Sequence, residues 1–145
     1  MTLCTQKLCK VVTTRDNTTK QTNGSLVEIF TEGRKTLSYV TTILPGHMKG
    51  YHLHNVRAAR YFPIAGKILV KLYSGSVKEE FILDADNPTT LFIPPFIATG
   101  IFNIGDVEAK LINFPSPPYD PNLITEQEEF TEEELEKTWK ELNEI

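Results

Sequence analysis

The sequence predicts an all-β fold, a sandwich or barrel of short strands followed by one C-terminal helix. Short runs rich in β-branched and aromatic residues recur along the chain, separated by turn signals built on glycine, proline and asparagine. Helical periodicity begins only after residue 130, so no helices alternate with the strands. The 145 residues, 40% hydrophobic and 23% charged, fit one globular domain with a single core.

Seven segments have the composition of strands. Turn or loop signals stand between them, namely NG, EG, PG, SG and DNP. In chain order the expected strands are SLVEIF (25–30), TLSYVTTIL (36–44), KGYHLH (49–54), KILVKLYS (67–74), EEFILD (79–84), TTLFIP (89–94) and AKLINF (109–114). The sequence shows no internal repeat.

The last residues, FTEEELEKTWKELNEI, predict a helix that packs on the sheet. Thr131 and Glu134 have the spacing of a capping box, in which each side chain satisfies a free amide of the first turn. Acidic residues fill that first turn, where the helix dipole favours them. Leu135, Trp139 and Leu142 share one face at helical spacing, which predicts a core contact for the tryptophan.

Composition narrows the classes of function. No apolar run approaches the ~20 residues that cross a bilayer, and the first residues lack the apolar segment of a signal peptide. Cys4 and Cys9 are too few for a disulfide scaffold or a zinc site, which favours the cytoplasm. A net charge of −4 argues against a nucleic-acid partner.

The histidines of KGYHLH are the first candidates for chemistry. Residues two apart on a strand point to the same side, so His52 and His54 are expected to face together. From the residues alone, three interpretations stay open: two metal ligands, an enzymatic base with its neighbour, or a solvated polar pair. An inward-facing pair would imply a polar pocket.

Spacing around the histidines resembles the first motif of the cupins. Gly46, five residues, His52, one residue and His54, with Gly66 further on, reproduce that motif, and IPPFIATGIFN resembles the second. The resemblance covers residues 24–121 and implies a double-stranded β-helix, the jelly-roll barrel. It implies a barrel with an N-terminal strand arm over residues 1–130 and a helix over 131–145.

The same comparison implies no metal and no other cofactor. Ala58 and Ala59 stand where metal-binding cupins have a glutamate, and Thr99 stands where they have a third histidine. Two histidines fall short of the three protein ligands that an open catalytic site generally uses. His47 lies in the PGHMKG turn, outside the ligand positions of the motif.

Several segments resemble dTDP-4-dehydrorhamnose 3,5-epimerase and the related dTDP-4-keto sugar 3,4-ketoisomerases. KGYHLH is similar to the RGxHxQ or RGxHxH signature, NGSLVEIF to RGxLvEiF, and AGKILVKLY to the GKxxV strand. IPPFIATGIF resembles IPxGxAHGF, and SPPYDP resembles the segment with the family's tyrosine. The five segments come in the family's order.

This resemblance implies proton transfer next to a sugar ketone, which acidifies the neighbouring C–H bonds. It gives His52 the role of base and Tyr119 the role of acid, two groups that can exchange protons near neutral pH. Lys67 is expected beside the sugar oxygens to stabilise the enolate, and His54 to orient the sugar or relay a proton. Lys49, Glu28, Arg60 and Tyr61 complete the expected substrate site, with Arg57 as a second source of a guanidinium for phosphate.

The resemblance also has gaps. Asn23 replaces an arginine of the family, and the aspartate that pairs with the catalytic histidine has no counterpart in the matched segments. We therefore expect a metal-independent epimerase or isomerase of a nucleotide-linked 4-keto-deoxy sugar, acting by a single epimerisation or a ketoisomerisation. A non-catalytic sugar- or nucleotide-binding cupin is the first alternative, and a metal-dependent cupin oxygenase or isomerase is the second.

Assembly is predicted from SLVEIF, which looks like an apolar edge strand set apart by the EGRK turn. Relatives of this kind commonly dimerise by exchanging such a strand. We therefore expect a two-fold homodimer.

Overall fold

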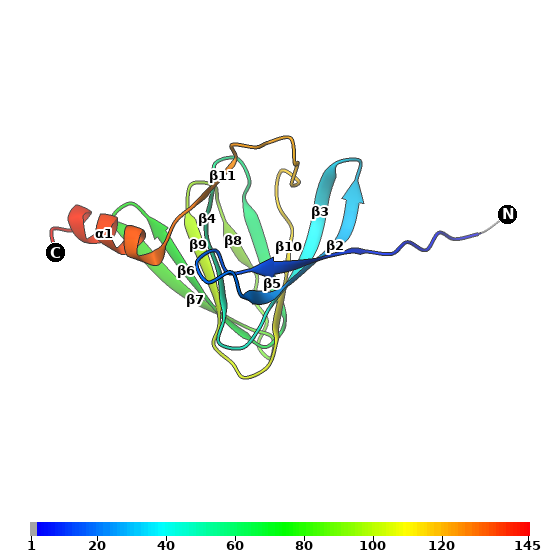
Figure 1. Cartoon of the computed structure of the whole chain (residues 1–145), viewed down its shortest axis with the longest axis horizontal. Coiled ribbons are helices and arrows are strands. Elements are labelled where there is room, and N and C mark those ends of the chain that lie inside the picture. Colours follow the sequence, from blue (N-terminus) through cyan, green and yellow to red (C-terminus); the bar gives the residue numbers. More distant parts are fainter. Residues whose placement is uncertain (1–2) are drawn as a thin grey trace.

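The computed structural model describes residues 3–145, which form strands β1 to β11 and helix α1 (Figure 1). The elements are β1 Lys10–Arg15, β2 Thr22–Glu32, β3 Lys35–Ile43, β4 Met48–His54, β5 Ala59–Ala65, β6 Lys67–Ser74, β7 Val77–Asp84, β8 Leu91–Ile93, β9 Ala98–Asn103, β10 Ala109–Asn113, β11 Gln127–Glu129 and α1 Glu132–Leu142. All seven strand segments expected from the sequence overlap with strands of the structure. Strands β1, β5, β9 and β11 were not expected.

Two antiparallel sheets build the molecule. One sheet has the order β1-β2-β3-β10-β5-β8, and the other has the order β11-β4-β9-β6-β7. The main core lies between them: Ile43 and Leu111 from the first sheet and Ile68, Val70 and Leu83 from the second are at most 1% exposed. The structure confirms the all-β class with a C-terminal helix.

Strand β4 separates two environments because its side chains alternate. Tyr51 is 1% exposed and packs with Tyr73 and Ala98, and Leu53 joins this cluster on the face that α1 covers. His52 and His54 therefore point to the opposite face, toward the interior between the sheets. Gly100 of β9 permits this packing, because a Cβ there would lie 2.6 Å from the ring of Tyr51.

Helix α1 begins as the sequence predicts. Thr131 is the N-cap, and the reciprocal hydrogen bonds between Thr131 and Glu134 complete the capping box. Leu135 and Trp139 pack against the cluster around Tyr51, while Leu142 is 56% exposed. In residues 3–145, no helix has the length and apolar character to cross a membrane.

The expectation that SLVEIF lies at a sheet edge is wrong. Strand β2, which contains this segment, pairs with β1 on one side and β3 on the other. A turn at Asp16, whose carboxylate accepts the amides of Thr18 and Thr19, brings β1 back along β2. Strand β1 is therefore one of the two edges of this sheet, and its outer side has no strand neighbour among residues 3–145.

Candidate functional site

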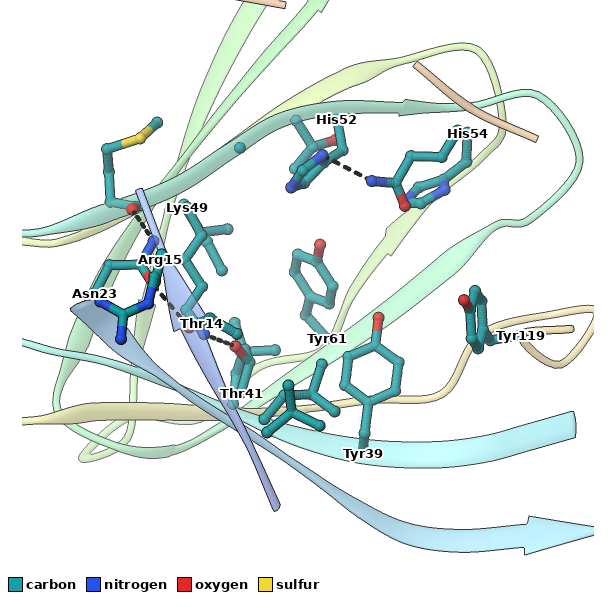
Figure 2. A pocket seen from close by; sticks show the side chains of 18 of the residues that line it. Thr14, Arg15, Asn23, Tyr39, Thr41, Lys49, His52, His54, Tyr61 and Tyr119 are labelled. Carbon is teal, nitrogen blue, oxygen red and sulfur yellow. Dashed lines mark hydrogen bonds between the residues drawn. The ribbon is translucent and has the colours of Figure 1, made fainter. Parts of the chain in front are cut away.

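A cavity of about 560 Å³ lies between β1, β2 and β3 of one sheet and β4 and β9 of the other (Figure 2). Its volume is in the range of small-molecule sites. Seven of the nine residues selected from the sequence line it, namely Glu28, Lys49, His52, His54, Arg57, Tyr61 and Tyr119. The two histidines thus face the cavity together, as their spacing on one strand predicts.

Lys67 and Arg60 lie elsewhere, which corrects two expectations. Lys67 shares the outer face of β6 with Lys71, because the alternate residues Ile68 and Val70 are buried in the core. Its ammonium lies 3.7 Å from the carboxylate of Asp84, and its side chain is 50% exposed.

Arg60 also points outward, because successive side chains on β5 leave from opposite faces of the strand. Its neighbour Tyr61 lines the cavity, so the side chain of Arg60 leaves from the other face of β5. The guanidinium carbon lies 5.4 Å from the ring centroid of Phe92, which is 55% exposed. Neither Lys67 nor Arg60 can therefore contact a ligand in the cavity.

His52 contacts two side chains of β11. Its Nδ1 lies 2.9 Å from the amide nitrogen of Gln127 and 3.8 Å from a carboxylate oxygen of Glu129. Burial lowers the pKa of His52, and the charges of His54, Arg57 and Lys49 lower it further. The carboxylate of Glu129 raises this pKa but does not outweigh them. His52 is therefore favoured as a neutral imidazole near pH 7.

His54 belongs to a buried ion-pair network. Its Nδ1 lies 3.1 Å from Oε2 of Glu126, a carboxylate that also accepts from Nε of Arg57 at 2.9 Å and from the Arg57 backbone amide at 3.0 Å. Burial and the nearby Arg57 lower the pKa of His54, while Glu126 opposes them. Burial would raise the pKa of Glu126, but hydrogen bonds from Arg57 and His54 lower it, so it stays ionised.

Lys49 occupies the opposite side of the cavity from His54 and Tyr119 (Figure 2). Its ammonium donates to the backbone carbonyl of Ser25 at 3.1 Å and to the hydroxyl of Thr41 at 2.6 Å. Both acceptors are uncharged, and in residues 3–145 no carboxylate forms an ion pair with Lys49. Burial lowers its pKa to about 8.

Three tyrosines, Tyr39, Tyr61 and Tyr119, line the cavity between the histidines and β3 (Figure 2). Burial raises the pKa of Tyr61, with a smaller contribution from Tyr39, so Tyr61 stays a protonated donor. Tyr119 lies in the segment between β10 and β11, and its backbone exchanges hydrogen bonds with Thr36 at 2.8 and 3.1 Å. Its ring lies 4.7 Å from the guanidinium carbon of Arg57.

The residues around the histidines do not fit the three-ligand metal site of cupins. Ala58 and Ala59 offer no donor, and Thr99, which pairs in register with His52, uses its hydroxyl to donate to the carbonyl of Ile97. Among the residues from 3 to 145, no three histidine, cysteine, aspartate or glutamate side chains are arranged to hold a metal ion. His47 is not among the residues that line the cavity.

Sequence reasoning missed several residues of the site, among them Glu126, Gln127 and Arg15. Glu126 and Gln127 reach the histidines only because residues 115–126 bring β11 back beside β4. Glu126 is one of many acidic residues near the C-terminus, and nothing in the sequence marks it as buried. Arg15, which lines the cavity from β1, was missed together with its strand.

Comparisons with known proteins agree with this architecture. A family model described as the polysaccharide biosynthesis C-terminal domain matches residues 19–124. No curated protein matches the chain. Among solved structures, the capsular polysaccharide assembling protein CapF from Staphylococcus aureus is similar with a TM-score of 0.67 and 23% identity, over 82% of this chain and 34% of that chain.

Two further structures share the fold. ChmJ, a 3'-monoepimerase from Streptomyces bikiniensis solved in complex with dTDP, has a TM-score of 0.58 and 15% identity, over 66% of this chain and 51% of that chain. NovW, a 4-keto-6-deoxy sugar epimerase from Streptomyces spheroides, has a TM-score of 0.58 and 20% identity, over 68% of this chain and 53% of that chain. The chain thus spans about a third of CapF and about half of the other two. These likenesses show a shared fold, a jelly roll of two antiparallel sheets.

Proposed function

Because the chain belongs to the family of the polysaccharide biosynthesis C-terminal domain, we propose that it acts on a nucleotide-linked sugar. The proposed reaction is the metal-independent epimerisation or isomerisation of a 4-keto-deoxy sugar. One observation carries the proposal: two histidines and three tyrosines line a single cavity that also contains a partly buried lysine without a carboxylate partner.

The proposed chemistry is proton transfer beside the ketone. A neutral imidazole removes the proton from the carbon next to the carbonyl, and the electron pair of that C–H bond forms an enolate. Hydrogen-bond donors in the cavity stabilise the negative charge on the enolate oxygen. Tyr119 then returns a proton to the opposite face of the same carbon, or a proton is delivered to the neighbouring position in an isomerisation. The tyrosinate and the imidazolium recover by proton exchange with water.

The basic side of the cavity is proposed to bind the diphosphate of the nucleotide. Lys49 is partly buried without a carboxylate partner, and Arg15 approaches from β1, where its Nη1 donates only to the carbonyl of Lys20 and the hydroxyl of Thr22. An anionic ligand would satisfy both cations. Glu28 and Tyr61 are proposed to contact hydroxyls of the sugar or the ribose.

The fold relatives suggest the first substrate to test. NovW and ChmJ are described as a 4-keto-6-deoxy sugar epimerase and a 3'-monoepimerase. We therefore choose dTDP-4-keto-6-deoxyglucose, which has acidic C–H bonds on both sides of its ketone.

The test is exchange of carbon-bound protons with solvent. The chelator-treated protein is incubated with dTDP-4-keto-6-deoxyglucose in deuterium oxide, and proton NMR follows the signals next to the ketone. We expect deuterium to replace at least one of these protons, and a double variant with asparagine for His52 and His54 to lose the activity by ~10² or more.

Other results would select the alternatives. Tight binding of the sugar nucleotide without exchange would contradict the reaction and indicate a binding module. Exchange that disappears with chelator and returns with one metal ion per chain would contradict the metal-independent mechanism.

A further inference from the structure

Strand β11 places side chains directly beside the two histidines. In the antiparallel pair of β4 and β11, Gln127 lies opposite His54 and Glu129 lies opposite His52. Together with Glu126, which precedes the strand, these residues surround the Nδ1 atoms of both imidazoles. The acceptor or donor character of each neighbour fixes which ring nitrogen carries the proton.

Arg57 orients the amide of Gln127. Its Nη2 donates to Oε1 of Gln127 at 3.4 Å, which requires the amide NH₂ group to point the other way. That NH₂ group lies 2.9 Å from Nδ1 of His52 and donates to it. Nδ1 of His52 is therefore an acceptor without a proton, and neutral His52 carries its proton on Nε2.

Glu126 has the opposite effect on His54. An ionised carboxylate only accepts hydrogen bonds, so its contact of 3.1 Å requires the proton of neutral His54 on Nδ1. Nη2 of Arg57 also lies 3.1 Å from this nitrogen. However, its two hydrogens already have acceptors in Glu126 at 3.3 Å and Gln127 at 3.4 Å. Placing the proton on Nδ1 satisfies all of these groups and leaves Nε2 of His54 with a free lone pair.

We propose that Glu126 and Gln127 are positioning residues that hold the histidines in opposite tautomers, with His54 as the base and His52 as a hydrogen-bond donor. The proposal rests on the proposed function and replaces the role of base that the resemblance gives to His52. Nε2 of His54 removes the proton next to the ketone and becomes an imidazolium, whose charge the carboxylate of Glu126 stabilises. Nε2–H of His52 donates to the ketone oxygen as the negative charge of the enolate develops there.

The carboxylate of Glu129 does not change the tautomer of His52. Glu129 lies 3.8 Å from Nδ1 of His52, which is beyond hydrogen-bond distance, while the amide of Gln127 is at 2.9 Å. A base role for His52 would need a proton on that nitrogen and an acceptor in place of the amide. The surroundings of His52 therefore favour donation into the cavity.

The test exchanges the amide of Gln127 for a carboxylate. In Gln127→Glu, the new carboxylate can only accept, so His52 should move its proton to Nδ1 and lose its donor toward the cavity. Nitrogen-15 NMR of the histidine side chains distinguishes the two tautomers directly. We expect opposite tautomers for the two histidines in the wild type, and in Gln127→Glu a switch of His52 alone with a ~10²-fold or larger loss of deuterium exchange.

Two further variants sharpen the result. Glu128→Gln is the matched control, because Glu128 is exposed on the same strand and pairs with Leu53; it should leave both tautomers and the exchange rate unchanged. His54→Asn should lower the rate of deuterium exchange by a factor of ~10² to 10⁴, the usual contribution of a general base. His52 should keep its proton on Nε2 in this variant.

The spectra and the exchange assay separate this proposal from the proposed function. Both histidines in one tautomer in the wild type, or an unchanged His52 in Gln127→Glu, would overturn the positioning roles. Opposite tautomers in a protein that exchanges no protons would overturn the reaction and with it the role of His54 as a base, while supporting the hydrogen-bond assignment.

Discussion

Lys49 has a cost in stability, and it is one of the two cations that we propose to bind the diphosphate. Its ammonium is held by two uncharged oxygens, and burial lowers its pKa from 10.5 to about 8. A lowered pKa means that the native fold destabilises the charged form, by about 1.4 kcal/mol for each pKa unit. We expect Lys49→Met to raise the melting temperature at pH 7 by a few degrees and to weaken dTDP binding by ~10-fold or more. Lys67→Met is the control outside the cavity and should change neither; a Lys49→Met variant that binds dTDP normally would contradict the proposed role.

The stability difference should depend on pH. Between the native pKa of about 8 and the ordinary value of 10.5, the unfolded chain holds a proton on Lys49 that the native state lacks. Wild-type stability therefore rises with pH across this window relative to Lys49→Met, which lacks the group. Denaturant unfolding at pH 7, 8.5 and 10 should show the advantage of the variant decreasing toward pH 10. An advantage that stays constant from pH 7 to pH 10 would contradict the lowered pKa.

Single residues of the site were predictable where a short motif contained them. The alternation of β4 is local, so KGYHLH was enough to place His52 and His54 on one face. Lys67 was misplaced because the resemblance fixed its position in a strand and not the face to which it points. Glu126 reaches His54 only because the chain returns after 72 residues, so no local pattern marks it.

At the scale of the elements, the missed strands have physical reasons. Strand β5 contains Pro63, which lacks an amide donor and lies next to a shift of register against β10. Strand β9 contains Gly100, a residue that weakens a strand prediction but is needed beneath the ring of Tyr51. Strand β11 has the sequence QEE, and only its pairing with β4 makes it a strand. Helix α1 was predictable because its capping box and apolar stripe are local signals.

The contact of α1 with the outer face of β4, β9 and β6 should be measurable. Trp139 packs near Tyr51 and Tyr73, and the ammonium of Lys78 lies 3.8 Å from its ring centroid. Since the ring is only partly buried, we expect Trp139→Ala to lower the free energy of unfolding by about 2 kcal/mol, below the cost of a fully buried tryptophan. Leu142→Ala, in the same helix but 56% exposed, should cost less than about 0.5 kcal/mol. Circular dichroism must follow unfolding, because Trp139 is the only tryptophan; equal effects of both substitutions would contradict the packing.

For the whole molecule, the least protected sheet edge lies at β1. Strand β7, an edge of the other sheet, carries Lys78, Glu79 and Glu80, and charges of this kind discourage strand pairing. Strands β8 and β11 are only three residues long. Strand β1 has six residues, its Val11 is 65% exposed, and the preceding segment carries Leu8 at 97% exposure. Because β1 also lines the cavity, pairing at this edge would hold one wall of the site in place.

We therefore propose that two copies pair through the outer edge of β1 to form a two-fold homodimer, in place of the edge at SLVEIF that the sequence suggested. Light scattering at micromolar concentration should give twice the mass of one chain. Val11→Lys places a charge on the exposed side of β1 and should shift the protein toward the monomer, while Val77→Lys, at a position 52% exposed on β7, should leave the dimer intact. Because Lys10, Val12 and Thr14 of β1 line the cavity, loss of the dimer should also weaken dTDP binding. A wild-type chain that scatters as a monomer would rule out the dimer, and a Val11→Lys variant that remains dimeric would place the interface on another edge.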